Sequence, residues 1–166
     1  MSMKPAYSTL IGMALACTAL TGCNKQAGVP AEPPSAAAPE APAGLAASNG
    51  RLMLPAVKGN PGAVYFNIVN SGDADASIAG VFVDGAKSAE LHMTRESGST
   101  SSMMAMSNIP VPKGQTVKFA PGGNHVMAMD LSPSLMSGGR TDVTLTFATG
   151  DKLTFPAAIE APGAAR

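Results

Sequence analysis

The sequence has no Trp, few other aromatic residues and only two Cys, and each shortage excludes a class of protein. Two Cys cannot form the disulfide framework that holds many small secreted domains together. The 11 Lys and Arg residues are balanced by 11 Asp and Glu residues, so the chain lacks the basic surface that a nucleic acid requires. We therefore expect no nucleic-acid partner.

Catalytic residues are also scarce. After Cys23 the chain has two His, His92 and His125, and no further Cys. No Ser–His–Asp spacing or pair of carboxylates singles out a nucleophile or a general acid. The sequence therefore predicts that the protein is not an enzyme. A blue-copper electron-transfer site is excluded as well, because it needs a thiolate beside two His.

The first residues are typical of an export signal. Lys4 precedes an apolar run over residues 10–16, which is too short to span about 30 Å of hydrocarbon. The run is followed by Leu20-Thr21-Gly22-Cys23, which resembles the bacterial lipobox, in which the Cys is acylated and becomes the first residue of the mature protein. We therefore predict a lipoprotein signal peptide over residues 1–22 and lipidation of Cys23.

The segment after Cys23 is rich in Pro and Ala and poor in branched apolar residues, so residues 23–48 are predicted to be a disordered tether. Asn24 follows the Cys, where an Asp would retain a lipoprotein in the inner membrane of enteric bacteria. We therefore expect a periplasmic protein that contacts a membrane only through its lipid anchor, with the outer membrane favoured.

The remainder of the chain reads as a β-protein. Short runs rich in Val, Ile, Phe and Thr are separated by Gly, Asn, Asp and Pro, and residues 144–147 alternate with a period of two. This pattern predicts an all-β fold, a single Greek-key β-sandwich over residues 49–160 with a disordered tail over 161–166. The predicted strands are Leu52–Val57, Ala63–Asn70, Ser77–Val83, Ala89–Thr94, Met103–Asn108, Thr116–Phe119, His125–Leu131, Asp142–Ala148 and Lys152–Ala157.

Methionine is unusually frequent and gathers around the two His. Every Met after Cys23 except Met53 lies between Met93 and Met136. Imidazole and thioether together form a soft donor set that suits Cu(I), whereas Zn(II) sites favour Cys, His and carboxylate. The sequence therefore predicts a Cu(I) site.

Strand geometry brings some of these residues together. His125 and Met127 are two apart on a predicted strand and share one face. His92 and the Met cluster at 103–106 flank a predicted hairpin loop over residues 96–102. One register of this hairpin places Met103 on the His92 face, and the alternative register places Met104 and Met106 there. Periodicity does not choose between them.

The spacing of these residues resembles that of the periplasmic copper chaperones of the PCu(A)C type. The family's pattern is a His, ten residues, a Met, twenty-one residues, then His-x-Met, and His92, Met103, His125 and Met127 fit all four positions. Gly62–Asn70, Glu90–Met93 and Pro121–Met127 are also similar to segments of the family. The similarity covers roughly residues 51–158.

The resemblance implies a cupredoxin-like sandwich that holds Cu(I) at an exposed site through His92, Met103, His125 and Met127. It also implies delivery of copper for cytochrome c oxidase assembly, to an oxidase subunit or to another copper chaperone. The chain departs from the family at Met104-Ala105, where Arg-Pro is common, and at Asn124, where an aromatic residue is common.

The other residues of the cluster and the acidic side chains are given simpler roles. Met93, Met104, Met106 and Met129 are expected to be core residues or secondary contacts, and Glu90 is expected to be solvated surface. The alternative function is a metal-free Ig-like module for adhesion or envelope assembly.

Overall fold

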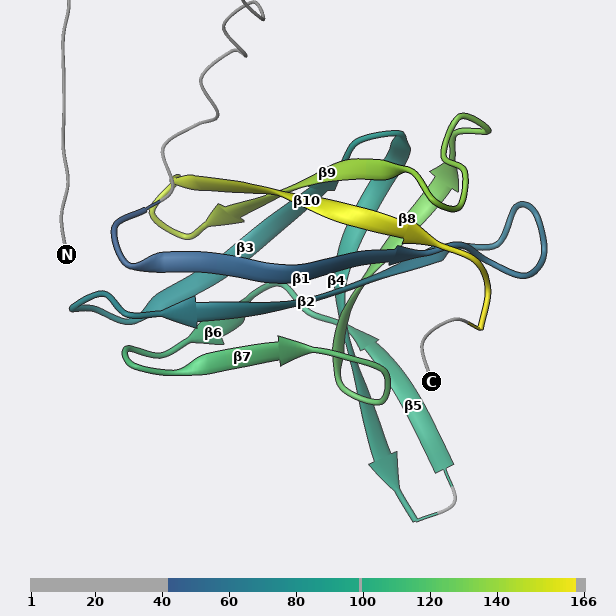
Figure 1. Cartoon of the computed structure of the whole chain (residues 1–166). Coiled ribbons are helices and arrows are strands. Elements are labelled where there is room, and N and C mark those ends of the chain that lie inside the picture. The colour runs from purple at the N-terminus through teal and green to yellow at the C-terminus, as the bar shows by residue number, and fades with distance from the viewer. Residues whose placement is uncertain (1–41, 99, 164–166) are drawn as a thin grey trace, which may run out of the picture. The chain divides into compact units, whose positions relative to one another are not determined.

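The computed structural model describes residues 42–98 and 100–163, and this part of the chain forms ten β-strands and no helix (Figure 1). The predicted all-β class is confirmed. A helix that could cross a membrane is accordingly absent from these residues. The strands are β1 (Leu45–Met53), β2 (Gly62–Asn70), β3 (Ala76–Val83), β4 (Ala86–Ser97), β5 (Thr100–Ala105), β6 (Ile109–Val111), β7 (Thr116–Phe119), β8 (Asn124–Leu131), β9 (Arg140–Phe147) and β10 (Lys152–Glu160).

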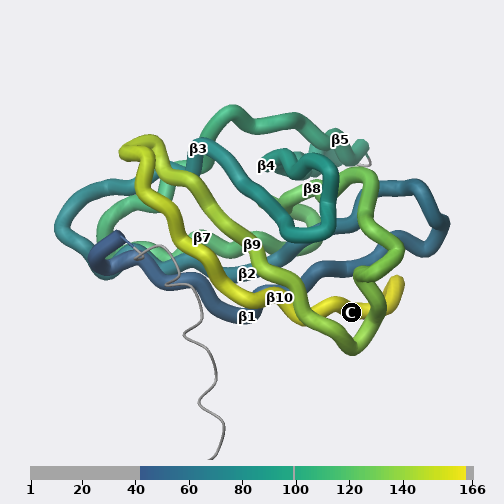
Figure 2. The backbone as a smooth tube through the Cα atoms, turned by 90° about the horizontal axis from the view of Figure 1, so that it is seen from above, coloured from purple at the N-terminus to yellow at the C-terminus, as the bar shows by residue number. Residues whose placement is uncertain are grey.

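Hydrogen bonds join the strands in the order β5-β4-β8-β7-β2-β1-β10-β9-β3-β6, and β8 also pairs with β2. This sheet folds over on itself, and Figure 2 shows β3, β4 and β8 on one side of β1, β2 and β10. Most neighbours are antiparallel, whereas β1–β10 and β7–β8 are parallel. The predicted cupredoxin-like β-sandwich is therefore confirmed. The predicted signal peptide (1–22), Cys23 and most of the predicted tether lie outside the described residues.

The core lies between the two layers because alternate residues of each strand point inward. In β2, Val64, Phe66 and Ile68 are buried, and their strand neighbours are less so. Phe66 stacks on Phe119 of β7 with ring centroids 4.1 Å apart. It also contacts Phe155 of β10, at a centroid distance of 4.9 Å. These aromatic contacts fix β2 against strands on both sides of it.

The predicted bounds of the first strand and of the tether are wrong. β1 begins at Leu45, inside the predicted tether, and ends at Met53 rather than at Val57. Leu45 is buried, and β1 pairs with β2 at both of its ends, with a bulge between Ser48 and Arg51. The Pro- and Ala-rich composition hides this pairing, because it is made by backbone groups. The strand ends before Pro55, which has no backbone N–H to donate.

The sequence pattern missed β6 entirely. Its three residues are too few to show a period of two, and Pro110 stands in the middle. β6 pairs with β3 at one end of the strand order, where a proline is tolerated because no further strand needs its N–H. Ile109 and Val111 on either side of the proline are buried and complete the core.

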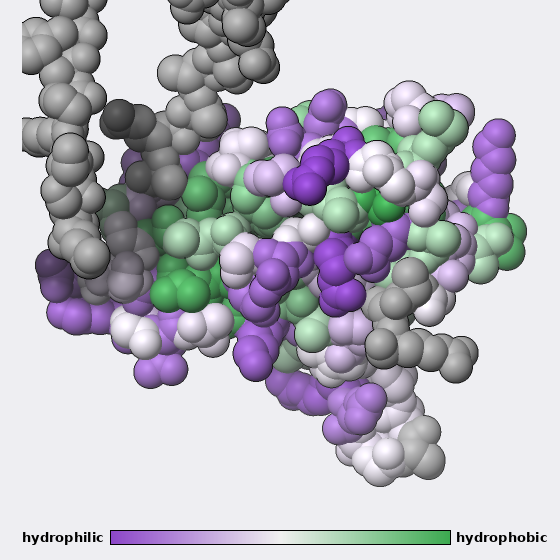
Figure 3. Space-filling model, in the orientation of Figure 1, coloured by the Kyte–Doolittle hydropathy of each residue, from purple (hydrophilic) through white to green (hydrophobic). Residues whose placement is uncertain are grey.

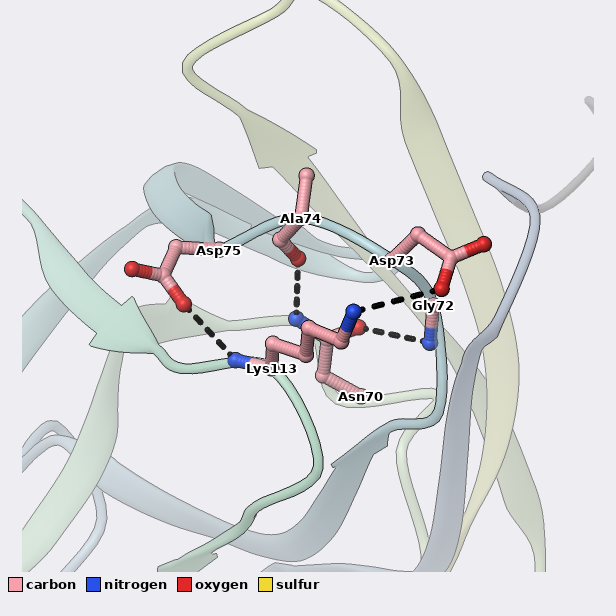
Figure 4. Close-up of polar contacts among 6 residues, drawn as sticks. All are labelled: Asn70, Gly72, Asp73, Ala74, Asp75 and Lys113. Carbon is pink, nitrogen blue, oxygen red and sulfur yellow. Dashed lines mark hydrogen bonds and ion pairs between the residues drawn. The ribbon is translucent and has the colours of Figure 1, made fainter.

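One end of β2 is fixed by a buried amide (Figure 4). The Nδ2 group of Asn70 donates to the carbonyl oxygens of Ala74 (2.9 Å) and Val111 (2.8 Å), and its Oδ1 accepts from the N–H of Gly72 (3.0 Å). Lys113 binds carboxylates of the loop after β2 through its N–H and its Nζ. These contacts therefore hold the β2–β3 and β6–β7 loops together at the C-terminal end of β2.

Candidate metal centre

His92 on β4 and His125 on β8 lie directly opposite each other in an antiparallel pair. Their ring centroids are 5.8 Å apart, and the ring planes are inclined by 39°. Side chains in this relation share one face of the sheet and can interact directly. Two imidazoles that are distant in the sequence are thus brought together by the β4–β8 pairing.

The register of the β4–β5 hairpin determines which Met lies beside the histidines. Thr94 pairs with Met103, and His92 pairs with Ala105. Because alternate residues of a strand share a face, Met103 lies on the His92 face and Met104 lies on the opposite face. Of the two registers that the sequence allows, the structure has the one that places Met103 with the histidines.

Met127 follows His125 by two residues on β8 and shares its face. Met103, His125 and Met127 line a shallow cavity of about 280 Å³ together with Tyr65. His92 does not line this cavity, but its ring lies beside that of His125. The predicted residues thus gather at the base of the arm that β4 and β5 form where they extend beyond the other strands (Figure 1).

The centre is closed on the histidine side and open on the hairpin side. His125 is 7% exposed, whereas Met103 is 61% exposed. The side chain of His92 is also largely buried. An ion bound here would rest against fixed imidazoles and would be approached from the hairpin side, where Met103 is exposed.

The backbone orients His125. Its Nδ1 lies 3.0 Å from the carbonyl oxygen of Gly123, to which a protonated Nδ1 donates. In the neutral ring the lone pair is then on Nε2. A carbonyl or carboxylate partner on the other ring nitrogen is the usual second contact of a metal-bound His.

Glu90 orients His92 through Nε2, whereas His125 is held through Nδ1. The Nε2 atom of His92 lies 3.2 Å from Oε2 of Glu90. The Nδ1 atom is buried and has no hydrogen-bond partner in the described part of the chain. A buried polar atom without a partner costs about 1–3 kcal/mol, which a bound cation would offset. The Nδ1 lone pair therefore fits a metal ligand.

Sequence reasoning missed Glu90 and Tyr65 as neighbours of the site. Glu90 is half exposed, as expected of surface, yet its carboxylate is bound to His92. The available signal was the spacing of two residues on one predicted strand, which puts Glu90 and His92 on the same face.

Tyr65 lies beside the site and has a shifted pKa. Burial raises the pKa of Tyr65, and the nearby charge of Arg51 lowers it in part. The Arg51 guanidinium also lies 5.9 Å from the centre of the Tyr65 ring.

The donors at this centre are two imidazoles and two thioethers. This soft set suits Cu(I). Zn(II) sites favour Cys, His and carboxylate ligands. Within residues 42–98 and 100–163 no three His, Cys, Asp or Glu side chains come together to hold a metal. The observed side chains therefore fit a monovalent soft ion.

Comparisons with known proteins agree with this fold. The family model described as "Putative lipoprotein LpqE-like" matches residues 45–159. A curated relative, "Putative lipoprotein Lxx21020" of Leifsonia xyli subsp. xyli (strain CTCB07), is 35% identical over 98 residues, which make up 58% of this chain. The aligned part also spans 58% of the length of that relative.

The solved structures similar to this one include PCuAC domains and a Cu(I)-bound protein. The copper-bound PCuAC domain from PmoF2 is 26% identical with a TM-score of 0.61, over 75% of this chain and 99% of that domain. The Cu(I) form of DR1885 from Deinococcus radiodurans is 25% identical with a TM-score of 0.55, over 70% of this chain and 76% of that one. The resemblance to the PCu(A)C type is confirmed, and the chain belongs to the LpqE-like family.

Proposed function

We propose that this protein is a copper(I) chaperone of the cell envelope, which binds one Cu(I) through His92, Met103, His125 and Met127. The observation that carries the proposal is the pair of strand registers, since β4–β8 pairing sets the histidines opposite each other and β4–β5 pairing adds Met103 to the same face. The copper-bound state named for one similar domain and the Cu(I) state named for another support the choice of metal.

The geometry suits a carrier that releases its ion. The imidazoles supply fixed donors, Nδ1 of His92 and Nε2 of His125, because each ring is held at its other nitrogen. The exposed Met103 supplies a weak thioether that an acceptor's ligand can replace first. Transfer then proceeds by exchange of one ligand at a time, and no covalent bond of the protein is made or broken.

The cellular setting rests on the sequence and on the family. Cys23 carries the lipid, residues up to Leu45 connect it to the sandwich, and the protein is anchored in the periplasm, at the outer membrane. Copper is delivered for cytochrome c oxidase assembly, to an oxidase subunit or to another copper chaperone. The lipoprotein names of the family model and of the curated relative support the anchor.

A competition titration tests this function. The full chain is titrated with Cu(I) in the presence of a Cu(I) chelator and, separately, with Zn(II). We expect one tightly bound Cu(I) per chain. We also expect a strong preference for Cu(I) over Zn(II), because two thioethers are poor ligands for the harder ion. Transfer of bound Cu(I) to a candidate acceptor then identifies the partner. Affinity no better than that of a surface His would favour the metal-free Ig-like module instead.

A further inference from the structure

A second group of thioethers lies on the reverse face of the β4–β5 hairpin. Met93 and Met104 are direct cross-strand partners. The N–H of Met106 donates to the carbonyl oxygen of Leu91 (2.8 Å), which continues the same register by two residues beyond Met104. Met93, Met104 and Met106 therefore share the face opposite to that of His92 and Met103.

Strand geometry allows these three thioethers to reach a single ion. Directly opposed residues of an antiparallel pair have Cβ atoms about 4.5–5.5 Å apart, and diagonal neighbours lie within about 7–8 Å. Methionine has three rotatable bonds beyond its backbone and a polarisable sulfur, so its thioether can turn toward a common centre. Met93 and Met104 form the direct pair, and Met106 is the diagonal neighbour of Met93.

Packing does not account for the whole group. Met106 packs against the core, but Met104 is 40% exposed. It lies on the β4–β5 arm, which is mainly polar in the view of Figure 3. An exposed thioether on a polar arm fills no cavity, and its exposure leaves the sulfur accessible to an ion from solvent.

A polar group beside Met93 also lacks a partner. Asn124 on β8 is the cross-strand neighbour of Met93 on the side away from Met104. Its Oδ1 atom is buried and accepts no hydrogen bond from the described residues. In blue-copper sites an amide or backbone oxygen can replace a thioether as the weak axial ligand, so an amide oxygen can contact copper. Asn124 thus presents an unpartnered acceptor on the face that holds the three Met.

The charge beside this group is less unfavourable to a monovalent ion than to a divalent one. Arg95 follows Met93 by two residues on β4 and shares its face. A positive charge nearby repels a divalent cation more strongly than a monovalent one. Three neutral thioethers likewise favour a soft monovalent ion over a harder divalent ion.

We propose that Met93, Met104 and Met106 form a second binding site, for a soft monovalent cation such as Cu(I) or Ag(I), with the Asn124 amide oxygen beside it. The hairpin then carries one site on each face, with Met103 and Met104 belonging to different sites. This second site uses none of the residues of the first and stands whether or not the proposed carrier function is correct.

The test is an Ag(I) titration of the full chain with isotope-labelled Met methyl groups, followed by NMR. Ag(I) is a soft monovalent ion that is not oxidised by air. Single Met→Leu variants assign the methyl signals. We expect two equivalents to bind, and the signals of Met93, Met104 and Met106 to shift together as the second site fills. Met136 is remote in the sequence and exposed, so Met136→Leu is the matched control and should bind two equivalents.

Two double variants separate the sites. Met93→Leu with Met104→Leu should lose the second equivalent while the Met103 and Met127 signals still shift. Met103→Leu with Met127→Leu should leave the shifts of Met93, Met104 and Met106 intact, even if the first site is abolished. The proposal is overturned if the methyl signals of Met93, Met104 and Met106 stay fixed throughout, or if the first double variant still binds two equivalents. A thermal melt of each variant confirms its fold.

Discussion

His92 and His125 are cross-strand partners that are held through different ring nitrogens. The Glu90 carboxylate contacts Nε2 of His92, and the Gly123 carbonyl accepts from Nδ1 of His125. The remaining lone pairs are therefore Nδ1 on the first ring and Nε2 on the second. Because both rings are fixed before an ion arrives, binding loses little side-chain freedom on the histidine side, and the thioethers supply the adaptable part of the site.

The first prediction concerns the thioethers of the candidate centre. Met103→Leu and Met127→Leu should each weaken binding of the first Cu(I) by at least about tenfold, or ~1.4 kcal/mol. Met→Leu keeps volume and apolarity at a cost usually below ~1.5 kcal/mol, so the loss reflects the missing sulfur. Chelator competition at less than one equivalent of Cu(I) measures the effect at the tighter site.

Met104→Leu is the matched control for this measurement, because its side chain lies on the other face of the same strand. It should change the first affinity little. A sensitive Met104 with a silent Met103 would contradict the observed register. If Met103, Met104 and Met127 are all silent while the variants remain folded in thermal melts, the metal-free module becomes the better explanation.

The second prediction concerns Glu90 as a positioning residue. Removing its carboxylate in Glu90→Ala frees the His92 ring, and loss of such an outer contact typically lowers metal affinity by about tenfold or more. Glu90→Gln should restore most of the affinity, because its amide oxygen can still accept from Nε2. Glu96→Ala removes a charge from the same strand but not the contact to His92, so it should have little effect. Equal losses in Glu90→Ala and Glu90→Gln would show that charge, not position, matters.

The sequence predicts the structure correctly where the period of two is enough to decide which side chains share a face of a strand. His125 and Met127 were expected on one face because they are two residues apart. Both lie on β8 and share one face of it. The hairpin register could not be predicted, since either pairing satisfies the same alternation. The observed register is continued by the backbone hydrogen bond from Met106 to Leu91.

Two other features were hidden for different reasons. β6 contains three residues and a proline, too few for a strand signal. The contact from Glu90 to His92 was hidden because it depends on a side-chain rotamer, which the sequence does not show. By contrast, the alternating apolar residues of β2 and β9 were sufficient to place those strands, since their inward positions are the core itself.

The third prediction concerns alkaline pH. Burial holds the pKa of Tyr65 above its ordinary value of 10.0, so the folded state favours the neutral phenol. A pKa that is higher in the folded than in the unfolded state gives stability that is present below pH ~10 and is lost as the pH rises through the folded pKa. The free energy of unfolding should therefore decrease above pH ~10, and Tyr65→Phe should reduce this decrease.

The phenolate absorbance of the folded protein provides the direct check. The chain has no Trp and only two Tyr, Tyr7 and Tyr65. The difference between the titrations of the wild type and of Tyr65→Phe therefore reports Tyr65 alone. A difference curve centred at or below the pKa of an unfolded tyrosine would contradict the prediction.

The last prediction concerns the start of the folded domain. A chain beginning at residue 49, the boundary that composition suggests, lacks the first part of β1 and its pairing from Leu45↔Asn70 to Ser48↔Asn67. A chain beginning at residue 42 keeps this pairing and the hydrogen bond from the Leu45 N–H to the carbonyl oxygen of Pro42 (3.0 Å). Because burial of a Leu side chain stabilises by about 1.5–3 kcal/mol, the shorter chain should be less stable by at least ~1.5 kcal/mol.

Urea unfolding of both chains measures this difference, and the midpoints compare stability where the slopes agree. Leu45→Ala in the longer chain separates the side chain from the backbone pairing, since it removes buried methyl groups but no strand hydrogen bond. The variant should fall between the two chains, because the shorter chain loses both contributions. Identical midpoints for the chains that begin at 42 and at 49 would mean that residues 45–48 add nothing to the stability of the sandwich.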